Sequence, residues 1–206
     1  MQGAYGRLFY LLSYDDLLHI DQGFEEAIKG WFDISGGAFI DVGANIGRYT
    51  VGLAENFNKV YAFEPVKETF VTLEKNIHLN GLENVTAMQI GLWSCSDEKE
   101  INIGMHKGLS SIVISLPNSL TQKIVVDTCD SIAESLDIHD VSLVKIDAEG
   151  AEVEILDGME KLLLRDSPRV IVEVKSMNRK KVCEMLDRLG YTLIEVRGEN
   201  HLFEIT

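Results

Sequence analysis

The stretch FIDVGANIG, residues Phe39–Gly47, decides the fold prediction. A short apolar run at residues 38–42 ends in Gly43, and the apolar positions that follow fit a short helix. A strand that turns into a helix in this way lies at the carboxyl edge of a parallel sheet, where ligands of open α/β sheets bind. Gly43 permits a sharp turn and a close approach of the backbone to a ligand, and Gly47 permits the helix to pack close to the strand.

Outward from this stretch, short apolar runs alternate with helical segments along most of the chain. This alternation predicts an α/β fold whose mostly parallel sheet carries helices on both faces. Strands are predicted at residues 38–42, 60–63, 85–90, 143–146, 170–174, 191–196 and 201–205. Helices are predicted between them, among others at residues 131–136, 151–164 and 180–189.

Three regions depart from the alternation. Residues 100–126 carry strand-like runs, one of them at residues 112–114, with turn residues but no helical pattern between them, which predicts an antiparallel excursion. The last two strands are joined by residues 197–200, a hairpin length, so the closing strand should be antiparallel. Residues 1–37 show a mixed helical pattern and are predicted to form a small N-terminal helical cap on the single domain 1–206.

Composition excludes several classes of protein. With 46% hydrophobic and 25% charged residues, the 206-residue chain is neither disordered nor of low complexity. Its net charge of −14 repels phosphate backbones and anionic lipids, so no nucleic acid and no membrane is expected as a partner. The apolar run at residues 8–12 is too short for a signal peptide, which favours a soluble, cytoplasmic protein. The 3 cysteines lack zinc-site spacing and are expected to be reduced thiols.

Two acids indicate the kind of ligand that the loop would bind. Asp41 directly precedes the turn, and the loop lacks the GxGxxG spacing of a dinucleotide site. An acid at this position repels a pyrophosphate but suits a ligand with an ammonium and a sulfonium. The second strand ends in Glu64, whose carboxylate can accept hydrogen bonds from both hydroxyls of a ribose. Each feature alone is also explained by a tight turn or a helix cap, but together they indicate a cationic adenosyl ligand.

Three motifs extend this interpretation to a family. FIDVGANIG (residues 39–47), VYAFEP (residues 60–65) and LVKIDAEGAEVEILDG (residues 143–158) together resemble the FkbM family of class I S-adenosylmethionine-dependent methyltransferases. The resemblance covers roughly residues 38–196, and KIDAEGAE is its most specific part. It implies a Rossmann-like sheet of seven strands. It also implies an O-methyltransferase that acts on a hydroxyl of a sugar or a natural product, with S-adenosylmethionine as the cofactor.

The resemblance also implies which residues bind the cofactor. Glu64 matches the ribose-binding acid of the family, and the end of the third strand falls where the class lines the adenine. The end of the fourth strand falls beside the transferable methyl group. The residues assigned to the cofactor in this way are Asp41, Gly43, Ala44, Asn45, Gly47, Glu64, Gly91, Leu92 and Asp147.

Carboxylates are the candidate catalytic groups. Asp147, Glu149 and Glu152 follow the fourth predicted strand, and Glu173 lies near the end of its neighbour, so they can converge on one cleft. Glu149 or Asp147 is the candidate base that deprotonates the acceptor hydroxyl, with Glu173 as a second acid. A divalent cation bridged by Asp147 and Glu173 is the competing version. Glu152 is more simply explained as a solvated acid at a helix N-terminus.

Three further side chains admit two interpretations each. Lys145, inside a predicted parallel strand, is expected to pair with a neighbouring carboxylate, and a catalytic role is its less favoured interpretation. His106 lies in the excursion, where a solvated loop position is favoured over a catalytic base. Trp93 can stack on adenine or on a sugar, or it can line the core.

Two other classes of function remain open beside methyl transfer to a small-molecule or saccharide hydroxyl. One is a nicotinamide-dependent oxidoreductase, which the missing GxGxxG disfavours. The other is a methyltransferase-like fold that binds its ligand without chemistry. A nucleic-acid base methyltransferase is disfavoured by the net charge and by the absence of an Asn/Asp-Pro-Pro-aromatic motif after the fourth strand. The sequence identifies neither the acceptor nor the oligomeric state.

Overall fold

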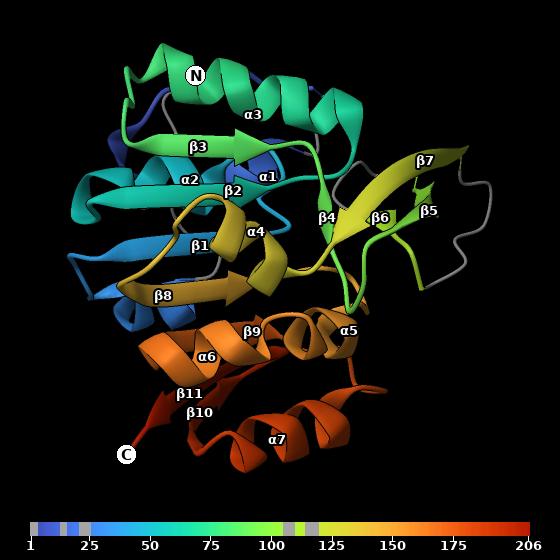
Figure 1. Ribbon diagram of the computed structural model, residues 1–206. Helices are drawn as coiled ribbons and strands as arrows, with labels where there is room; N and C mark the ends of the chain where they lie inside the picture. The colour runs from blue at the N-terminus through green and yellow to red at the C-terminus, as the bar shows by residue number, and fades with distance from the viewer. Residues whose placement is uncertain (1–3, 13–15, 21–25, 105–109, 114–119) are drawn as a thin grey trace.

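The computed structural model describes residues 4–12, 16–20, 26–104, 110–113 and 120–206. Its main sheet has seven strands in the order β10-β11-β9-β8-β1-β2-β3 (Figure 1). Their bounds are β1 (Ala38–Val42), β2 (Lys59–Phe63), β3 (Val85–Met88), β8 (Val141–Ile146), β9 (Arg169–Glu173), β10 (Tyr191–Arg197) and β11 (Asn200–Ile205). Only β11 runs against its neighbours β9 and β10, while the other pairs are parallel. The predicted Rossmann-like sheet with an antiparallel last strand is confirmed.

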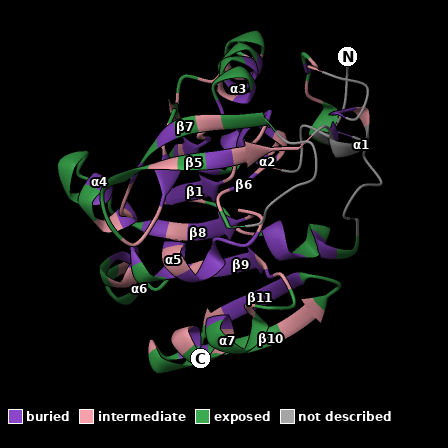
Figure 2. Cartoon of the chain, turned by 90° about the vertical axis from the view of Figure 1, so that its right-hand side faces the viewer, coloured by how far each residue is buried: buried purple, intermediate pink, exposed green. Residues whose placement is uncertain are grey.

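Helices cover both faces of this sheet. The bounds of the longer helices are α2 (Arg48–Leu53), α3 (Lys67–Leu79), α4 (Cys129–Ser135), α5 (Glu152–Asp157), α6 (Glu160–Asp166) and α7 (Arg179–Arg188). Because neighbouring strand residues point to opposite faces, Ile40 belongs to the core under α4–α7, and Phe39 to the core under α2. Figure 2 shows the central strands buried on both sides.

A second, smaller sheet projects from the carboxyl edge of the first (Figure 1). It contains β4 (Gly91–Leu92), β5 (Asp97–Ile103), β6 (Ser110–Ser111) and β7 (Leu120–Asp127), in the order β4-β7-β5-β6. The β5–β7 and β5–β6 pairs are antiparallel, as predicted for the excursion. The strand predicted at residues 112–114 is wrong, because the pairing with β5 uses Ser110 and Ser111 instead. Ile114 and His106 lie outside the described residues.

The prediction of one helix over residues 151–164 is also wrong. The helix ends after Asp157, and α6 begins at Glu160. A Cβ at Gly158 would lie 2.0 Å from the carbonyl oxygen of Trp93. The backbone after β4 therefore passes directly against the helix at this point, and only glycine leaves room for it.

The described part of the N-terminal cap contains three short helical turns, while residues 7–12 and 33–37 are not helical. The three turns are η1 (Ala4–Gly6), α1 (Asp16–Ile20) and η2 (Glu26–Phe32), with η3 (Ala54–Asn56) beside them in the core domain. Phe9 and Ile20 pack with Ile46 and Val51 in one buried cluster. Residues 21–25 of the predicted cap lie outside the described residues. Across the described ranges, the helices are too short or too polar to cross a membrane.

Candidate functional site

The glycine loop, residues 43–47, connects β1 to α2 at the carboxyl edge of the sheet. The backbone amides of Gly43 and Ala44 both donate to the carbonyl oxygen of Phe63, at 3.0 Å. Gly43 has a φ of +75°, and a Cβ there would lie 1.8 Å from the carbonyl oxygen of Asp147. The loops after β1 and β8 thus meet backbone to backbone. This contact alone requires glycine at position 43.

Gly47 serves a different contact from the predicted one. Its φ is +96°, and a Cβ there would lie 2.7 Å from Cδ1 of Leu73 on α3. The expectation that Gly47 allows α2 to approach the strand is therefore corrected, because the limiting neighbour is α3. The glycine loop is enclosed between β1, the loop after β8 and α3.

Glu64, at the end of β2, holds the glycine loop in place. Its Oε2 accepts the backbone N–H of Asn45 at 3.0 Å, and its Oε1 accepts that of Val66 at 2.9 Å. Burial raises the pKa of Glu64 to about 7, although the two backbone hydrogen bonds act in the opposite direction. Asn45 adopts a left-handed φ of 52°, which its hydrogen bond to Glu64 helps to maintain.

Asp41 and Lys145 are cross-strand neighbours on β1 and β8, under the glycine loop. Thr50 donates a hydrogen bond of 2.5 Å to Oδ2 of Asp41. Burial raises the pKa of Asp41 to about 6, against the effects of this hydrogen bond and of the Lys145 charge. The side chain of Lys145 is fully buried, and its Nζ lies 3.8 Å from Oδ2 of Asp147. The predicted pairing of Lys145 with a neighbouring carboxylate is confirmed.

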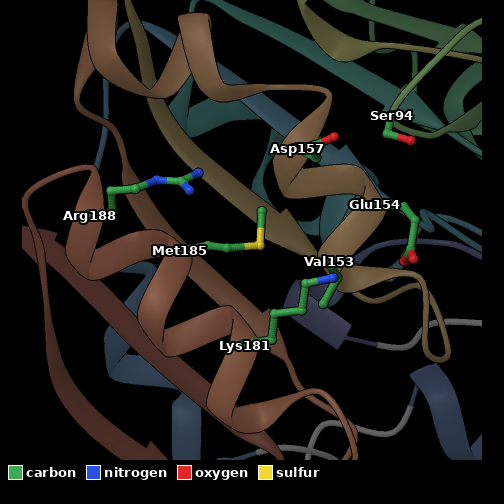
Figure 3. A pocket seen from close by; sticks show the side chains of 7 residues that line it. All are labelled: Ser94, Val153, Glu154, Asp157, Lys181, Met185 and Arg188. Atoms are coloured by element: carbon green, nitrogen blue, oxygen red, sulfur yellow. The ribbon is translucent and has the colours of Figure 1, made fainter.

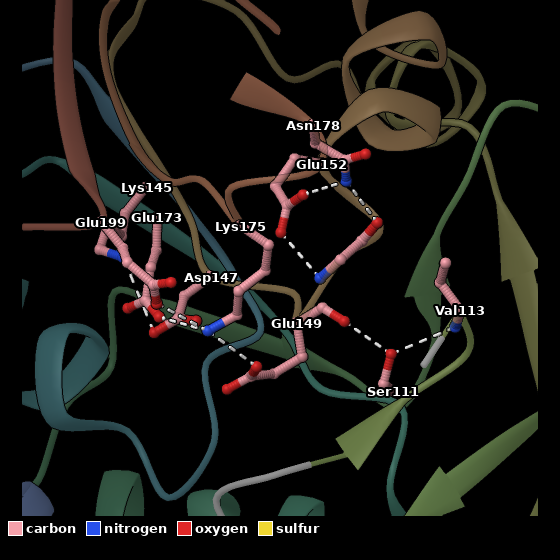
Figure 4. A network of polar contacts seen from close by, with 11 residues as sticks. Ser111, Val113, Lys145, Asp147, Glu149, Glu152, Glu173, Lys175, Asn178 and Glu199 are labelled. Carbon is pink, nitrogen blue, oxygen red and sulfur yellow. Dashed lines mark hydrogen bonds and ion pairs between the residues drawn. The ribbon is translucent and has the colours of Figure 1, made fainter. Parts of the chain in front are cut away.

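Three predicted catalytic acids do converge at the next loops along the edge. One carboxylate oxygen from each of Asp147, Glu149 and Glu173 lies within 4.8 Å of the others. Lys175 reaches into this carboxylate cluster, and its Nζ lies 3.0 Å from both Glu149 and Glu173 (Figure 4). It also lies 3.0 Å from Glu199, in the turn between β10 and β11.

The sequence prediction missed Lys175. The signal was present, because Lys175 is two residues after Glu173, and side chains two apart along an extended segment share a face. The convergence of Glu149 and Glu199 on the same ammonium could not be predicted, since both lie in turns far away in the sequence.

The charged groups of the carboxylate cluster and Lys175 shift one another's pKa values. Burial raises the pKa of Glu149, while Lys175 lowers it and the neighbouring Glu173 and Glu199 raise it further. Burial would lower the pKa of Lys175, but its hydrogen bonds to Glu173, Glu149 and Glu199 outweigh that effect and raise it. Lys175 is therefore a permanent ammonium near neutral pH. It cannot act as a base, but it can neutralise and orient Glu149.

Glu149 is fixed by its backbone as well as by its side chain. Its φ of 47° is left-handed, which is uncommon for a residue other than glycine and costs conformational energy. Its carbonyl oxygen accepts the hydroxyl of Ser111 at 2.6 Å (Figure 4). Ser111 is buried on β6, so the second sheet is joined directly to Glu149.

Glu152 does not belong to the cluster, and the expectation that it is solvated is wrong. It is fully buried, and its Oε1 accepts the backbone N–H of Gly150 at 2.7 Å. Its Oε2 accepts the side-chain amide of Asn178, which also donates to the carbonyl oxygen of Gly150. Burial raises the pKa of Glu152 against these hydrogen bonds. Glu152 thus joins the start of α5 to the start of α7 and stabilises the turn that presents Glu149.

Gly91 and Leu92 lie past the end of the third strand, not within it. The main-sheet strand ends at Met88, and the two residues form β4, which pairs with Val126 and Asp127 of β7. Both are buried. Trp93 follows β4, and its side chain packs against two separate buried hydrophobic clusters. Nζ of Lys99 lies 4.9 Å from the centre of its ring. These contacts favour the core interpretation of Trp93.

A separate groove of about 270 Å³ lies between α5, α7 and the chain after β4 (Figure 3). Its lining is Ser94, Val153, Glu154, Asp157, Lys181, Met185 and Arg188. None of these side chains belongs to the glycine loop or to the carboxylate cluster. The candidate active site is therefore the edge between β1 and β8, not this groove.

The architecture and the site together define a class of protein. The strands on either side of β1 and β8 are added in opposite directions, so the glycine loop and the carboxylate cluster lie at a topological switch point. With the antiparallel β11, this is the Rossmann-like fold of methyltransferases. Residues 41–193 match the Methyltransferase FkbM domain, and the chain belongs to the FkbM family.

The chain is similar to several members of this class. It is 31% identical over 147 residues to the hexuronic acid methyltransferase AglP of Haloferax volcanii, a match that covers 71% of this chain but only 59% of the relative. Its fold matches the crystal structure of methyltransferase FkbM from Methylobacillus flagellatus KT, with a TM-score of 0.61, 19% identity, and coverage of 85% of this chain and 45% of that one. It also matches M. jannaschii TYW2 in complex with AdoMet, with a TM-score of 0.52, 19% identity, and coverage of 98% and 84%.

Proposed function

We propose that the chain is an S-adenosylmethionine-dependent methyltransferase that methylates a hydroxyl group of a sugar or a small natural product. The observation that carries the proposal is the joint position of three features at one sheet edge: the glycine loop, the two buried acids Asp41 and Glu64, and the carboxylate cluster. Family membership supports methyl transfer. The similarity to a protein described as a hexuronic acid methyltransferase supports a sugar acceptor.

The residues at the glycine loop fit a cationic adenosyl cofactor. Two buried carboxyl groups with raised pKa values lie at the loop, and a positively charged ligand compensates the charge that they acquire on ionisation. Glu64 would bind the ribose hydroxyls, and Gly91 and Leu92 would line the adenine. Asp41 and Asp147 would face the positively charged end of the cofactor. The rest of the glycine loop would hold the cofactor through Gly43, Ala44, Asn45 and Gly47.

The carboxylate cluster would serve the acceptor. When bound, S-adenosylmethionine supplies a methyl group activated by a sulfonium. An alcohol has a pKa close to that of water, about 15.7, so the attacking oxygen needs a base. Glu149 is the favoured base because burial raises its pKa and because Ser111 and Lys175 fix its position. It would accept the hydroxyl proton as the oxygen–methyl bond forms and the sulfur–methyl bond breaks, with S-adenosylhomocysteine as the leaving group. Asp147 and Glu173 would orient the hydroxyl.

A divalent cation is the second version of the acceptor site. Asp147, Glu149 and Glu173 offer three oxygens close enough for one ion. In the structure, however, the ammonium of Lys175 already lies among two of these carboxylates. We therefore favour a cluster in which the charge of Lys175, and not a metal ion, offsets part of the negative charge.

The proposal is tested by transfer of a radiolabelled methyl group from S-adenosylmethionine to sugars, phenols and small hydroxylated metabolites, with magnesium and with EDTA. We expect transfer to a hydroxyl acceptor at the same rate in both conditions. Loss of activity in EDTA that magnesium restores would establish the metal version instead.

Binding measurements separate the other classes of function. S-adenosylhomocysteine bound without transfer to any acceptor would support a binding module. NADH bound in place of S-adenosylhomocysteine would support an oxidoreductase.

Cofactor affinity should depend on pH. The folded-state pKa values of Asp41 and Glu64, about 6 and about 7, exceed the ordinary values of 3.8 and 4.5. The folded protein therefore retains these protons more strongly than the unfolded chain, and it loses stability as the pH rises from about 4 to about 7. A cationic ligand binds more strongly when the two acids are ionised, so its binding restores part of the lost stability.

We expect the affinity for S-adenosylmethionine to rise at least about tenfold between pH 5 and pH 8, with proton release at the lower pH. Calorimetry in two buffers of different ionisation enthalpy measures both quantities. An affinity independent of pH would contradict the assignment of these acids.

A further inference from the structure

The N-terminal segment Leu8–Tyr10 is held to α3 by two asparagine side chains. Asn80 accepts the backbone N–H of Leu8 at 3.0 Å and donates to its carbonyl oxygen at 2.8 Å. Asn76 accepts the N–H of Tyr10 at 2.6 Å and donates to its carbonyl oxygen at 3.2 Å. Residues four apart on a helix are separated by about 6 Å along its axis, close to the spacing of alternate residues in an extended chain. The two asparagines thus pair with the segment as a neighbouring strand would.

Asn76 makes a third hydrogen bond, and this one reaches the glycine loop. Its side-chain amide donates to the carbonyl oxygen of Ile46 at 2.8 Å. The amide of the next residue, Gly47, donates to the carbonyl oxygen of Ala44 at 2.9 Å. The peptide group between residues 46 and 47 is therefore held at both ends. Asn76 is completely buried, so without its side chain the Ile46 carbonyl would lose a hydrogen-bond donor that water cannot readily replace.

Apolar packing joins the same two parts of the chain. Phe9, between the two paired residues of the segment, is buried and packs with Ile46 and Val51. Two contacts extend the docking toward the N-terminus. The ring of Tyr5 lies 2.1 Å from where a Cβ of Gly52 would be, and Arg7 forms a salt bridge of 2.7 Å with Glu55. The N-terminal segment is therefore packed against the glycine loop and the helix α2 that follows it.

We propose that Asn76 is a positioning residue of the cofactor site, and that docking of the segment Leu8–Tyr10 and binding of the cofactor strengthen each other through it. The inference rests on the proposed function, because it takes the glycine loop as the cofactor site. Asn76 touches the loop and the segment with the same side chain, so whatever orders one favours the other. Linkage requires the effect to be reciprocal.

Three alanine variants separate positioning from plain stability. Asn76→Ala removes the bonds to both Ile46 and Tyr10. Asn80→Ala removes the bonds that hold Leu8 and the bond from its side-chain amide to the carbonyl oxygen of Asn76, but no bond to the glycine loop. The matched control is Asn84→Ala, because the Asn84 amide also donates to two backbone carbonyls, those of Ala54 and Phe57, away from the glycine loop. All three should lower the melting temperature.

We expect Asn76→Ala to weaken S-adenosylhomocysteine binding by at least about tenfold and to raise the KM for S-adenosylmethionine, with kcat at saturation within about twofold. Asn80→Ala should weaken binding by about two- to fivefold, and Asn84→Ala should leave it unchanged. Equal affinities in all variants would overturn the inference. Failure of the unaltered protein to bind S-adenosylhomocysteine would instead contradict the proposed function.

A measurement on the unaltered protein keeps the inference testable if Asn76→Ala does not fold. The amides of Leu8 and Tyr10 donate to the two asparagines, so their hydrogen exchange reports the docking directly. We expect saturating S-adenosylhomocysteine to slow exchange at both amides by at least about threefold. Unchanged exchange at these amides, with the cofactor bound, would refute the coupling.

Discussion

Glu149→Gln should lower kcat by about 10²- to 10⁴-fold, the usual contribution of a positioned general base. The amide keeps the shape of the side chain but cannot take the proton of the acceptor hydroxyl. Binding of S-adenosylhomocysteine should change little, because the side chain of Glu149 contacts Lys175 in the carboxylate cluster and not the glycine loop. The measurements are single-turnover methyl transfer and calorimetric titration with S-adenosylhomocysteine.

Glu154→Gln is the matched control for this variant. Glu154 is a partly exposed acid of α5 that lines the separate groove, so its replacement should leave both transfer and binding unchanged. If Glu149→Gln turns over at the rate of the unaltered protein, Glu149 is not the base, and Asp147 becomes the candidate to replace next. If Glu149→Gln also loses S-adenosylhomocysteine binding, its effect on turnover is structural.

Gly43→Ala should disrupt cofactor binding and lower stability. A Cβ at this position would lie 1.8 Å from the carbonyl oxygen of Asp147, so one of the two loops has to move. The left-handed backbone adds a cost of roughly 1–2 kcal/mol for a residue other than glycine. We expect a loss of at least about 3 kcal/mol in the free energy of unfolding, or about 6–12 °C in Tm, and a fall of more than about 100-fold in S-adenosylhomocysteine affinity.

Gly81→Ala separates the steric contact from the backbone conformation. Gly81 also has a left-handed φ, +63°, but its Cβ would have no neighbour within 4 Å. This variant should lose only the conformational part, roughly 1–2 kcal/mol, and keep its cofactor affinity. Equal effects of the two substitutions on stability and binding would show that the contact between the glycine loop and Asp147 is unimportant.

Much of the fold could be predicted from the sequence, because strand and helix periodicities are local. The strand at residues 38–42 and the antiparallel closing hairpin were both predicted and are both present. The predicted helix over residues 151–164 is interrupted after Asp157, where the Gly158 carbonyl oxygen accepts the backbone N–H of Asp130 and the Asp130 carboxylate accepts the N–H groups that begin α6. That interruption comes from a segment far away in the sequence, and no local pattern carries it.

The candidate site, like the fold, was predicted only in part. The sequence predicted that Asp147, Glu149 and Glu173 would meet, since carboxyl ends of adjacent parallel strands share an edge. For Glu152 it favoured a solvated position at a helix N-terminus, whereas the side chain is buried and turns to Asn178 and the backbone of Gly150. Side-chain direction in a turn depends on the backbone angles and neighbours of that turn, which residue spacing does not contain.

The amino-acid order by itself determined the parallel sheet, the position of the glycine loop and the gathering of acids at one edge, because each follows from periodicity and chain direction. Only the tertiary structure decided that Lys175 forms ion pairs with Glu149 and Glu173, that Gly43 faces the backbone of Asp147, and that Asn76 joins the N-terminal segment to the loop. These contacts connect residues on different elements. Their geometry exists only after the elements have packed.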